Sequence, residues 1–363
     1  MDPLFHLYNI ALPDALIVGA GIVGAACARE LARAGMTVEV WDESPAIGSG
    51  ATAAGMGHLA VMDDSEAQFA LTSYSQALWR EISSELPPQA EYLPCGSLWV
   101  AADDEELEEV HRKFRFYSGR GIAVRVLNSC ELELAEPNLR KGLAGGLLMP
   151  GDSVCYPPCA AAYFLSGIPV RLGKRAESLP DTGLIILATG TAITKLIPEA
   201  PVYPRKGHLL ITDRYPGFLN HQLIELGYLK SAHSTERDSV AFNAQPRQTG
   251  QILIGSSRQY GTVDPRTETP ILERMLARAC EYMPGVAGLS AIRTWAGFRA
   301  ATPDKLPLIG KWDGNVYLAT GHEGLGISTS LATARLLADE ILGRESAIPR
   351  EPYMPRRSFA ANA

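Results

Sequence analysis

The chain has 363 residues, of which 46% are hydrophobic and 20% are charged, and its formal net charge is -7. This length suits two joined domains or one large α/β unit, and the composition is that of an ordinary globular protein. The acidic balance and the lack of a Lys/Arg stripe argue against a nucleic-acid partner. The longest apolar runs are shorter than the roughly 20 residues that cross a bilayer, so we expect no transmembrane segment.

The amino end, "MDPLFHLYNIALPD", has neither the basic region nor the cleavage site of a signal peptide, so we expect a cytoplasmic protein. Six cysteines fit a reducing compartment. Cys155 and Cys159 stand close together but have no second cluster with zinc-like spacing. We therefore expect ordinary thiols and no metal.

Regular elements are predicted in this order along the chain. Residues 14–42 read as strand, turn, helix and strand, and a helix is expected over 66–86, stopped by two prolines. A strand follows over 96–103 and a charged, solvated helix over 104–121. The apolar run "GLIILATG" at 183–190 predicts a buried strand, and 203–293 is rich in strands with one helix over 270–283. The chain closes with a second strand, glycine turn and helix over 315–342.

This order predicts an α/β protein with a Rossmann-like FAD-binding domain and an inserted mixed-sheet α+β substrate domain. We expect the first domain to be discontinuous, built from residues 1–87, 138–200 and 299–363. Residues 88–137 and 201–298 would then form the substrate, or cap, domain.

The first glycine turn, "VGAGIVG", carries Gly19, Gly21 and Gly24 between a strand and a helix. In this context the glycines permit a tight turn, close approach of a pyrophosphate and close helix packing, and the helix amino end faces the phosphates. Asp42 ends the second strand, where a carboxylate accepts hydrogen bonds from ribose hydroxyls. The motif predicts dinucleotide binding but does not separate NAD from FAD.

Several dispersed stretches together resemble the D-amino acid oxidase superfamily of flavoproteins, in the branch with glycine oxidase, sarcosine oxidase and D-amino acid dehydrogenases. They are "VGAGIVGAACARELARAGMTVEVWDES", "GSGATAAGMG", "LAEPNL", "IILATG", and "WAGFRAATPDKLPLIG" followed by "ATGHEGLGI". The resemblance covers nearly the whole chain and implies FAD as the cofactor. Because a helix amino terminus stabilises the reduced flavin, the second glycine turn is expected to bind the flavin end.

The cofactor-binding residues expected from the two glycine turns and from the resemblance form one set. They are Gly19, Gly21, Ile22, Val23, Gly24, Asp42, Glu43, Ser49, Gly50, Ala51, Thr52, Ala54, Gly55, Met56, Ala176, Ala188, Thr189, Gly190, Gly321, His322, Glu323, Gly324, Leu325, Gly326 and Ile327.

The resemblance also implies a substrate side, with Arg299 of "WAGFR" gripping the substrate carboxylate. An internal ion pair between Arg299 and Asp304 is the alternative. His208 and His58 lie in segments that approach the active site in the family, and either is a candidate proton acceptor or a structural residue.

Further candidates stand where this chain departs from glycine oxidase. Asn243 stands where a substrate-facing tyrosine is found there, and Gly324 where a second arginine is found, which argues against simple glycine oxidation. Glu323 is expected either to pair with a cationic group of another amino acid or to be solvated. Tyr260 and Arg258 are further pocket candidates.

The expected activity is FAD-dependent oxidation of the C–N bond of an amino acid or secondary amine, by hydride transfer from the α-carbon to flavin N5, giving an imine. D-amino acids, hydroxyproline and opine-like amines rank above glycine. Two alternatives stay open at this point: a cofactor-holding or electron-relay subunit of a hetero-oligomeric dehydrogenase, and an NAD-linked dehydrogenase. The segment around 165–183 is shorter than in the family, which suggests either an exposed adenine or a partner subunit.

Overall fold

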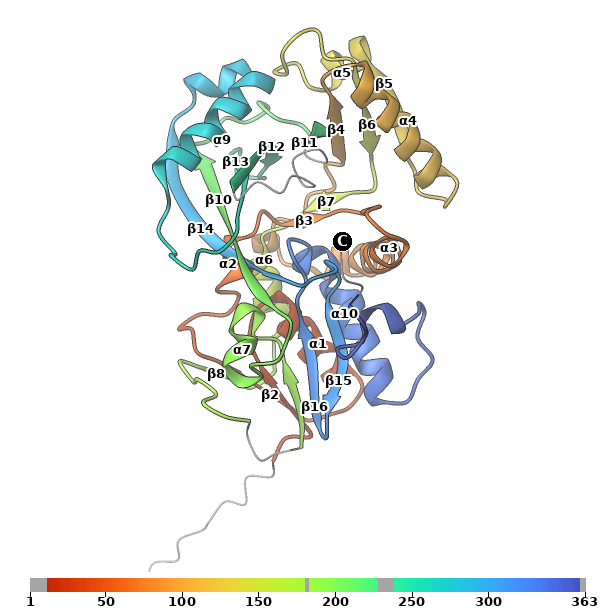
Figure 1. Cartoon of the computed structure of the whole chain (residues 1–363), viewed down its shortest axis with the longest axis vertical. Coiled ribbons are helices and arrows are strands. Elements are labelled where there is room, and N and C mark those ends of the chain that lie inside the picture. Colours follow the sequence, from red (N-terminus) through yellow and green to blue (C-terminus); the bar gives the residue numbers. More distant parts are fainter. Residues whose placement is uncertain (1–11, 180–182, 228–237, 360–363) are drawn as a thin grey trace, which may run out of the picture.

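The computed structural model describes residues 12–179, 183–227 and 238–359. It has two halves, each built on a large sheet, with the long strands at 203–212 and 291–301 reaching from one half toward the other (Figure 1). Most of the amino-terminal segment considered above for a signal peptide lies outside the described residues, as do residues 180–182 of the shortened segment.

The first half contains a sheet of six strands within the described residues, in the order β15-β16-β9-β1-β2-β8. The strands are β1 (Ala15–Val18), β2 (Val38–Asp42), β8 (Val170–Leu172), β9 (Leu184–Leu187), β15 (Leu308–Asp313) and β16 (Val316–Thr320). All pairings are parallel except that of β15 with β16. Parallel apolar strands covered by helices form a doubly wound sheet, which confirms the predicted Rossmann-like half.

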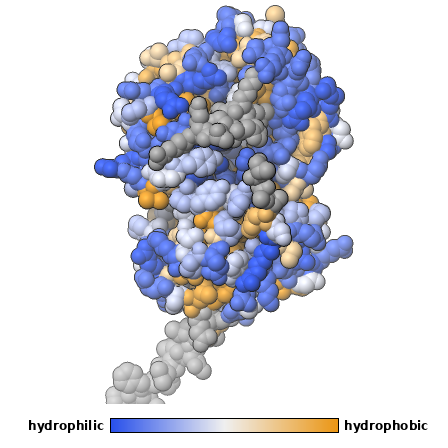
Figure 2. Space-filling view, viewed as in Figure 1, coloured by the Kyte–Doolittle hydropathy of each residue, from blue (hydrophilic) through white to orange (hydrophobic). Residues whose placement is uncertain are grey.

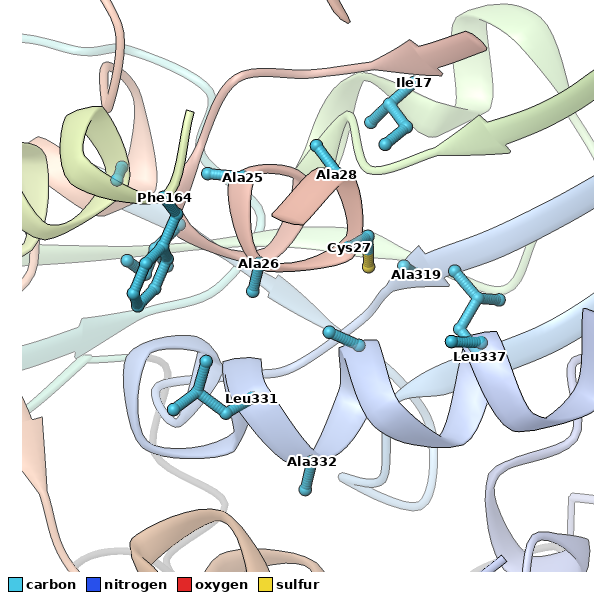
Figure 3. Close-up of a cluster of buried hydrophobic side chains, with 14 of the residues drawn as sticks. Ile17, Ala25, Ala26, Cys27, Ala28, Phe164, Ala319, Leu331, Ala332 and Leu337 are labelled. Atoms are coloured by element: carbon cyan, nitrogen blue, oxygen red, sulfur yellow. The ribbon is translucent and has the colours of Figure 1, made fainter. Parts of the chain in front are cut away.

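Helices α1 (Ile22–Arg33) and α10 (Gly326–Ile341), which follow the two glycine turns, pack against each other on one face of this sheet. Figure 3 shows why they approach closely: α1 presents small side chains, among them Ala26 and Cys27, to the buried face of α10. Leu331 and Leu337 of α10 fill the remaining space. The two ends of the chain therefore form one core, as the sequence predicts.

The remaining helices and short elements surround this core. They are α2 (Ala51–Ala54), α3 (Glu66–Ile82), α6 (Pro157–Phe164) and α7 (Ile193–Leu196), the small sheet β3 (His58–Leu59) with β7 (Ser153–Val154), and the 3-10 turns Ser83–Glu85, Pro88–Ala90, Gly190–Ala192 and Glu351–Tyr353.

The second half is a mixed sheet of eight strands within the described residues, in the order β14-β10-β13-β12-β11-β4-β6-β5. These strands are β4 (Ser97–Ala101), β5 (Arg125–Asn128), β6 (Gly145–Met149), β10 (Tyr203–Thr212), β11 (Gln222–Glu225), β12 (Asp238–Pro246), β13 (Ile252–Gln259) and β14 (Ala291–Ala301). Its helices are α4 (Asp104–Ser118), α5 (Ser129–Ala135) and α9 (Thr269–Tyr282), with a 3-10 turn at Pro284–Gly288. The inserted mixed sheet is as expected.

One expected domain boundary is wrong. We assigned residues 138–200 to the FAD-binding half, but β6 pairs with β4 and β5 in the second sheet. The strand is short and rich in glycine, so its apolar pattern did not indicate which sheet it joins. The boundary near residue 299 also falls within β14, which spans Ala291–Ala301.

Gly297 brings the two halves together. In the antiparallel pairing of β10 with β14, Gly207 lies opposite Gly297. A Cβ at Gly297 would lie 2.3 Å from the Cβ of Ala54, so only glycine lets the small-residue segment around α2 approach the second sheet. This contact closes the space between the two halves around a common cavity.

Figure 2 shows a face that is mostly hydrophilic, with hydrophobic residues in scattered patches. No helix in the described ranges is long and apolar enough to span a bilayer. All six cysteines, including Cys155 and Cys159, are free thiols.

Candidate active site

A cavity of about 710 Å³ lies between the two halves. It extends from the carboxyl end of β2 to strands β10, β12, β13 and β14 of the second sheet. Of the expected cofactor-binding residues all but Gly24 line it, namely Gly19, Gly21, Ile22, Val23, Asp42, Glu43, Ser49, Gly50, Ala51, Thr52, Ala54, Gly55, Met56, Ala176, Ala188, Thr189, Gly190, Gly321, His322, Glu323, Gly324, Leu325, Gly326 and Ile327.

Gly24 does not line the cavity but packs beneath it, against the backbone of Gly19. A Cβ at this position would lie 1.9 Å from the carbonyl oxygen of Gly19, so a larger residue would push α1 away from β1. A Cβ at Gly19 would likewise lie 2.4 Å from the carbonyl oxygen of Ala188, which begins the turn after β9. The glycines of the first turn thus set how closely the backbone segments of the cavity floor approach each other.

The dinucleotide end of the cavity fits FAD. The Asp42 carboxylate is fixed by the backbone N–H groups of Ala20 (2.6 Å) and Ser44 (2.7 Å), and a carboxylate retains lone pairs for ribose hydroxyls. Gly50 and Gly190 have φ of 60° and 57°, with open space where a side chain would stand. The buried Thr189 hydroxyl has no hydrogen-bond partner among the described residues. The carboxylate, the free hydroxyl and the open glycine backbone fit the hydroxyl and phosphate groups of a dinucleotide.

The second glycine turn opens α10 toward the other end of the cavity, where its first residues, Gly326 and Ile327, are lining residues. The residue preceding the helix makes no side-chain cap. The first N–H groups of α10 and its positive dipole end therefore face the part of the cavity that adjoins the second sheet, where negative charge is stabilised.

Arg299 projects from β14 into this end of the cavity. Its guanidinium lies above Gly207, where a Cβ would stand 2.4 Å from Nη1, and it donates to the carbonyl oxygen of Ser257 at 3.0 Å. Asp304 binds Arg357 instead, at 2.7 and 2.8 Å. The structure therefore rules out the internal Arg299–Asp304 pair and leaves Arg299 as a buried cation at the cavity wall.

His58 and Asn243 form a polar pair at the cavity wall. His58 Nδ1 lies 2.5 Å from Gln222 Oε1, a carbonyl oxygen, so the ring donates from Nδ1 and its Nε2 is an acceptor. The amide of Gln222 is held in turn by the Ser97 hydroxyl at 3.0 Å. Burial lowers the pKa of His58, and the charge of Arg299 lowers it further, so the ring is neutral at pH 7.

Asn243 completes the pair. Its Nδ2 lies 3.4 Å from His58 Nε2, and its buried Oδ1 has no hydrogen-bond partner among the described residues. A buried acceptor without a donor is unfavourable by roughly 1–3 kcal/mol, so this oxygen is available to accept a hydrogen bond from a group in the cavity. Asn243 Oδ1 is thus an acceptor without a partner among the described residues, and His58 Nε2 is an acceptor whose present donor is the Asn243 amide in a long hydrogen bond.

His208 does not belong to the site. Along β10, alternate residues Arg205, Gly207 and Leu209 line the cavity, so His208 points to the opposite face of the sheet. It is fully buried there, with Nδ1 at 2.9 Å from the Ser257 hydroxyl and Nε2 accepting from the Glu268 N–H at 3.2 Å. The expectation that His208 approaches the active site is wrong because side chains alternate along a strand.

Tyr260 and Glu323 contact a residue that the sequence reasoning missed, Arg205. Glu323 forms a buried ion pair with it, and Tyr260 lies at its side, with the hydroxyl at 3.4 Å. Tyr260 itself is not a lining residue of the cavity within the described structure. Arg205 could have been predicted from the sequence, because it shares the strand face of Gly207 and Leu209, which line the cavity. Nothing in the sequence around Gln222 indicates that it lies at the site.

The sequence model of the DAO family, described as FAD dependent oxidoreductase, matches residues 14–340. The chain belongs to this family. It is therefore a flavoprotein that uses FAD, and the NAD-linked alternative is set aside.

This flavoprotein is similar to two glycine oxidases over nearly their whole length and to a D-amino acid dehydrogenase over about three quarters of its length. It is 28% identical to glycine oxidase of Pseudomonas aeruginosa, with 94% of this chain and 98% of that protein covered. Against the crystal structure of glycine oxidase from Geobacillus kaustophilus the TM-score is 0.86 at 25% identity, with 96% and 99% covered. A D-amino acid dehydrogenase of Methylobacterium is 28% identical, with 79% of this chain and 73% of that protein covered.

Proposed function

We propose that this flavoprotein oxidises the carbon–nitrogen bond of an amino acid or of a secondary amine that carries a carboxylate. The observation that carries the proposal is the arrangement at one end of the cavity, where a buried arginine, a neutral histidine and an unpartnered amide oxygen line the same space. A carboxylate and an amine on one carbon are the groups that this set recognises.

Arg299 would bind the substrate carboxylate. Desolvation lowers the pKa of Arg299 to about 10, and a charge that is partly removed from water attracts an anion more strongly than an exposed one. A planar guanidinium also makes two parallel hydrogen bonds to a carboxylate, which fixes the orientation of the α-carbon. Orientation matters because hydride transfer needs the α-hydrogen within near-contact distance of its acceptor.

His58 and Asn243 would bind the amine. Asn243 Oδ1 accepts one N–H of the substrate ammonium, and His58 Nε2 takes one proton from it, which leaves the nitrogen with a lone pair. When the α-C–H bond breaks with its electron pair, this lone pair forms the C=N bond of an iminium ion, which loses a proton to give the imine that water then hydrolyses. FAD, when bound, accepts the hydride and both electrons.

Residues Gln222 and Ser97 position the base. Because Gln222 Oε1 accepts from Nδ1, the proton of the neutral ring is held on the far nitrogen and Nε2 stays available. The lowered pKa of His58 keeps the ring neutral at physiological pH. Both features favour a role in substrate oxidation over the electron-relay alternative, which needs neither an amine site nor a carboxylate site.

Anaerobic mixing of the FAD-loaded protein with a panel of D- and L-amino acids and N-substituted glycines tests the proposal. We expect at least one of them to bleach the oxidised-flavin absorbance in a single turnover and to yield an oxo acid. If none does so, while dithionite bleaches the same sample fully, the amine-oxidising function is contradicted.

Assembly with a second subunit is a further part of the proposal. Hydrogen cyanide synthase subunit HcnC of Pseudomonas protegens, a subunit by its name, is 27% identical over 96% of this chain. The shortened segment carries β8, an edge strand of the first sheet, and an edge strand presents backbone groups with which another chain can pair. Co-purification of the tagged chain from its native cells tests this, and recovery of the chain alone contradicts it.

A further inference from the structure

The hydrogen bonds behind His58 continue past Gln222 and Ser97 to a buried carboxylate, Asp152. His58 Nδ1 lies 2.5 Å from Gln222 Oε1, and Gln222 Nε2 donates to the Ser97 hydroxyl at 3.0 Å. Backbone bonds hold Asp152 at the end of this row, because the Gly96 N–H donates to the Asp152 carbonyl oxygen and the Gln222 N–H to the Gly96 carbonyl oxygen, each at 3.0 Å. Asp152 is buried and directly precedes β7, the strand that pairs with β3 of His58.

A second row of hydrogen bonds reaches Asp152 from α3. Arg80 Nη2 donates to Gln76 Oε1 at 2.6 Å, and Gln76 Nε2 donates to Asp152 Oδ1 at 2.7 Å. A guanidinium cannot accept a hydrogen bond, so the Gln76 amide has only one orientation that satisfies Arg80, and in it the amide donates to the carboxylate. Oδ1 also accepts from the Val61 N–H at 3.3 Å. Donors from two other segments therefore occupy Oδ1.

The other carboxylate oxygen, Oδ2, is left for Ser97. Oδ2 is buried and has no other donor among the described residues. Burial raises the pKa of Asp152 to about 7, although hydrogen bonds from the Ser97 hydroxyl, the Val61 N–H and the Gln76 amide lower it. At pH 8.5 the group is therefore a carboxylate that accepts from both rows.

A carboxylate at this place fixes the direction of every bond between it and His58. A serine hydroxyl carries one proton, and when it donates that proton to Asp152 the oxygen of Ser97 can only accept. The Gln222 amide must then turn its NH2 group to Ser97 and its oxygen to His58. That oxygen accepts from Nδ1–H, which leaves Nε2 of the neutral ring without a proton.

We infer that Asp152 is a positioning residue, which acts through Ser97 and Gln222 to keep the single proton of neutral His58 on Nδ1. Asp152 is not among the described residues that line the cavity, so it does not act on the substrate directly. The inference rests on the proposed function, in which Nε2 takes a proton from the substrate ammonium.

Asp152→Asn tests the inference with a side chain of almost the same size. The oxygen of the new amide keeps the two donors at Oδ1, so its NH2 group takes the place of Oδ2 and donates to Ser97. The Ser97 hydroxyl is then free to donate to Gln222, whose amide can turn and donate to His58 Nδ1. We expect the proton of the ring to move to Nε2 and kcat/KM for anaerobic flavin reduction at pH 8.5 to fall roughly tenfold, equivalent to about 1.4 kcal/mol.

The tautomer is measured directly in the FAD-loaded protein. Nitrogen-15 NMR spectra of histidine-labelled protein at pH 8.5 distinguish Nδ1–H from Nε2–H, and the signals of His58 are those that disappear in His58→Gln. Asp313→Asn, at an exposed position of β15, is the matched control and should change neither the tautomer nor the rate. A loss of activity in Asp152→Asn with an unchanged tautomer would overturn the inference, because Asp152 would then only support the fold.

Ser97→Ala separates positioning from a structural role. It removes the hydroxyl and leaves the bonds of Asp152 to Gln76 and Val61 in place. We expect Ser97→Ala to release the tautomer by itself, and Asp152→Asn to have no further effect on tautomer or rate in its background. Equal effects of Asp152→Asn in both backgrounds would overturn the inference.

If Asp152→Asn does not fold, Ser97→Ala still decides, since an unchanged tautomer in that variant contradicts the row of bonds. The two proposals fail in different ways. If no amine reduces the flavin, the proposed function fails, whereas an unmoved tautomer with normal flavin reduction by an amine contradicts the role of Asp152 alone.

Discussion

The two halves of the molecule carry their chemistry in different ways. In the FAD-binding half, the groups that we propose for the cofactor are mostly backbone: glycines that permit close approach and the amino ends of α1 and α10, with one carboxylate at the end of β2. In the substrate half, the groups that we propose for the substrate are side chains of β3, β12 and β14, which the strand pairings bring together. A substitution at a backbone position of the cofactor site is therefore expected to disturb FAD binding as a whole. The side chains of the substrate site can instead be substituted one at a time, which separates carboxylate binding from proton transfer.

The largest effect is expected in the FAD-binding half. In Gly24→Val the new Cβ would meet the Gly19 carbonyl oxygen at 1.9 Å, so α1 must move from β1 and the pyrophosphate site is lost. We expect the flavin-to-protein ratio of the purified variant to fall more than about tenfold. Gly288→Val, with open space around its Cβ, is the control and should keep its flavin. Normal flavin content in Gly24→Val would show that the turn is not the cofactor site.

The next largest effect is expected in the substrate half and should leave the FAD-binding half unaffected. Arg299→Gln removes the carboxylate anchor and leaves the cofactor cradle untouched, so kcat/KM should fall by up to roughly 1,000-fold, the effect of removing one partner of a buried charge pair. Flavin content should not change. Arg293→Gln on the same strand serves as the control, and anaerobic flavin reduction is the measurement. Equal losses in the two arginine variants would contradict a specific role for Arg299.

Removing the base has a smaller and pH-dependent effect. His58→Gln should reduce flavin roughly 100-fold more slowly at pH 7, the usual contribution of a general base. The rate should recover at high pH, where the substrate amine loses its proton to solvent. His111→Gln, at an exposed position of α4, is the control. A loss that is constant across pH would indicate that His58 only shapes the cavity.

The smallest effect is a shift of the pH profile. The folded protein lowers the pKa of His58, so the neutral base persists below its ordinary titration range and activity falls only as pH drops through the lowered value. In Gln222→Glu the new carboxylate stabilises the imidazolium and raises this pKa, which should move the acidic limb of kcat/KM upward by about 1–3 pH units. Gln248→Glu is the exposed control. An unmoved limb would mean that another group titrates.

The contrast between local backbone motifs and side chains that meet through strand pairing also explains how much of the site could be predicted from the sequence. Both glycine turns, Asp42 and the two-sheet architecture are local patterns, and each is found where it was expected. His208 was misplaced and Arg205 missed because the alternation along β10 was not applied to that strand. Gln222 was out of reach, since its contact with His58 joins positions 164 residues apart. The predicted domain boundary at residue 138 is wrong because the apolar pattern of a strand does not indicate which strand it pairs with.

The most direct test of this division is a crystal structure of the FAD complex with a redox-inert carboxylate analogue of an amino acid. The account predicts the analogue's carboxylate within hydrogen-bonding distance of Arg299, with its amine-side group facing His58 Nε2 and Asn243 Oδ1. An analogue bound elsewhere, or bound with its carboxylate away from Arg299, would contradict it.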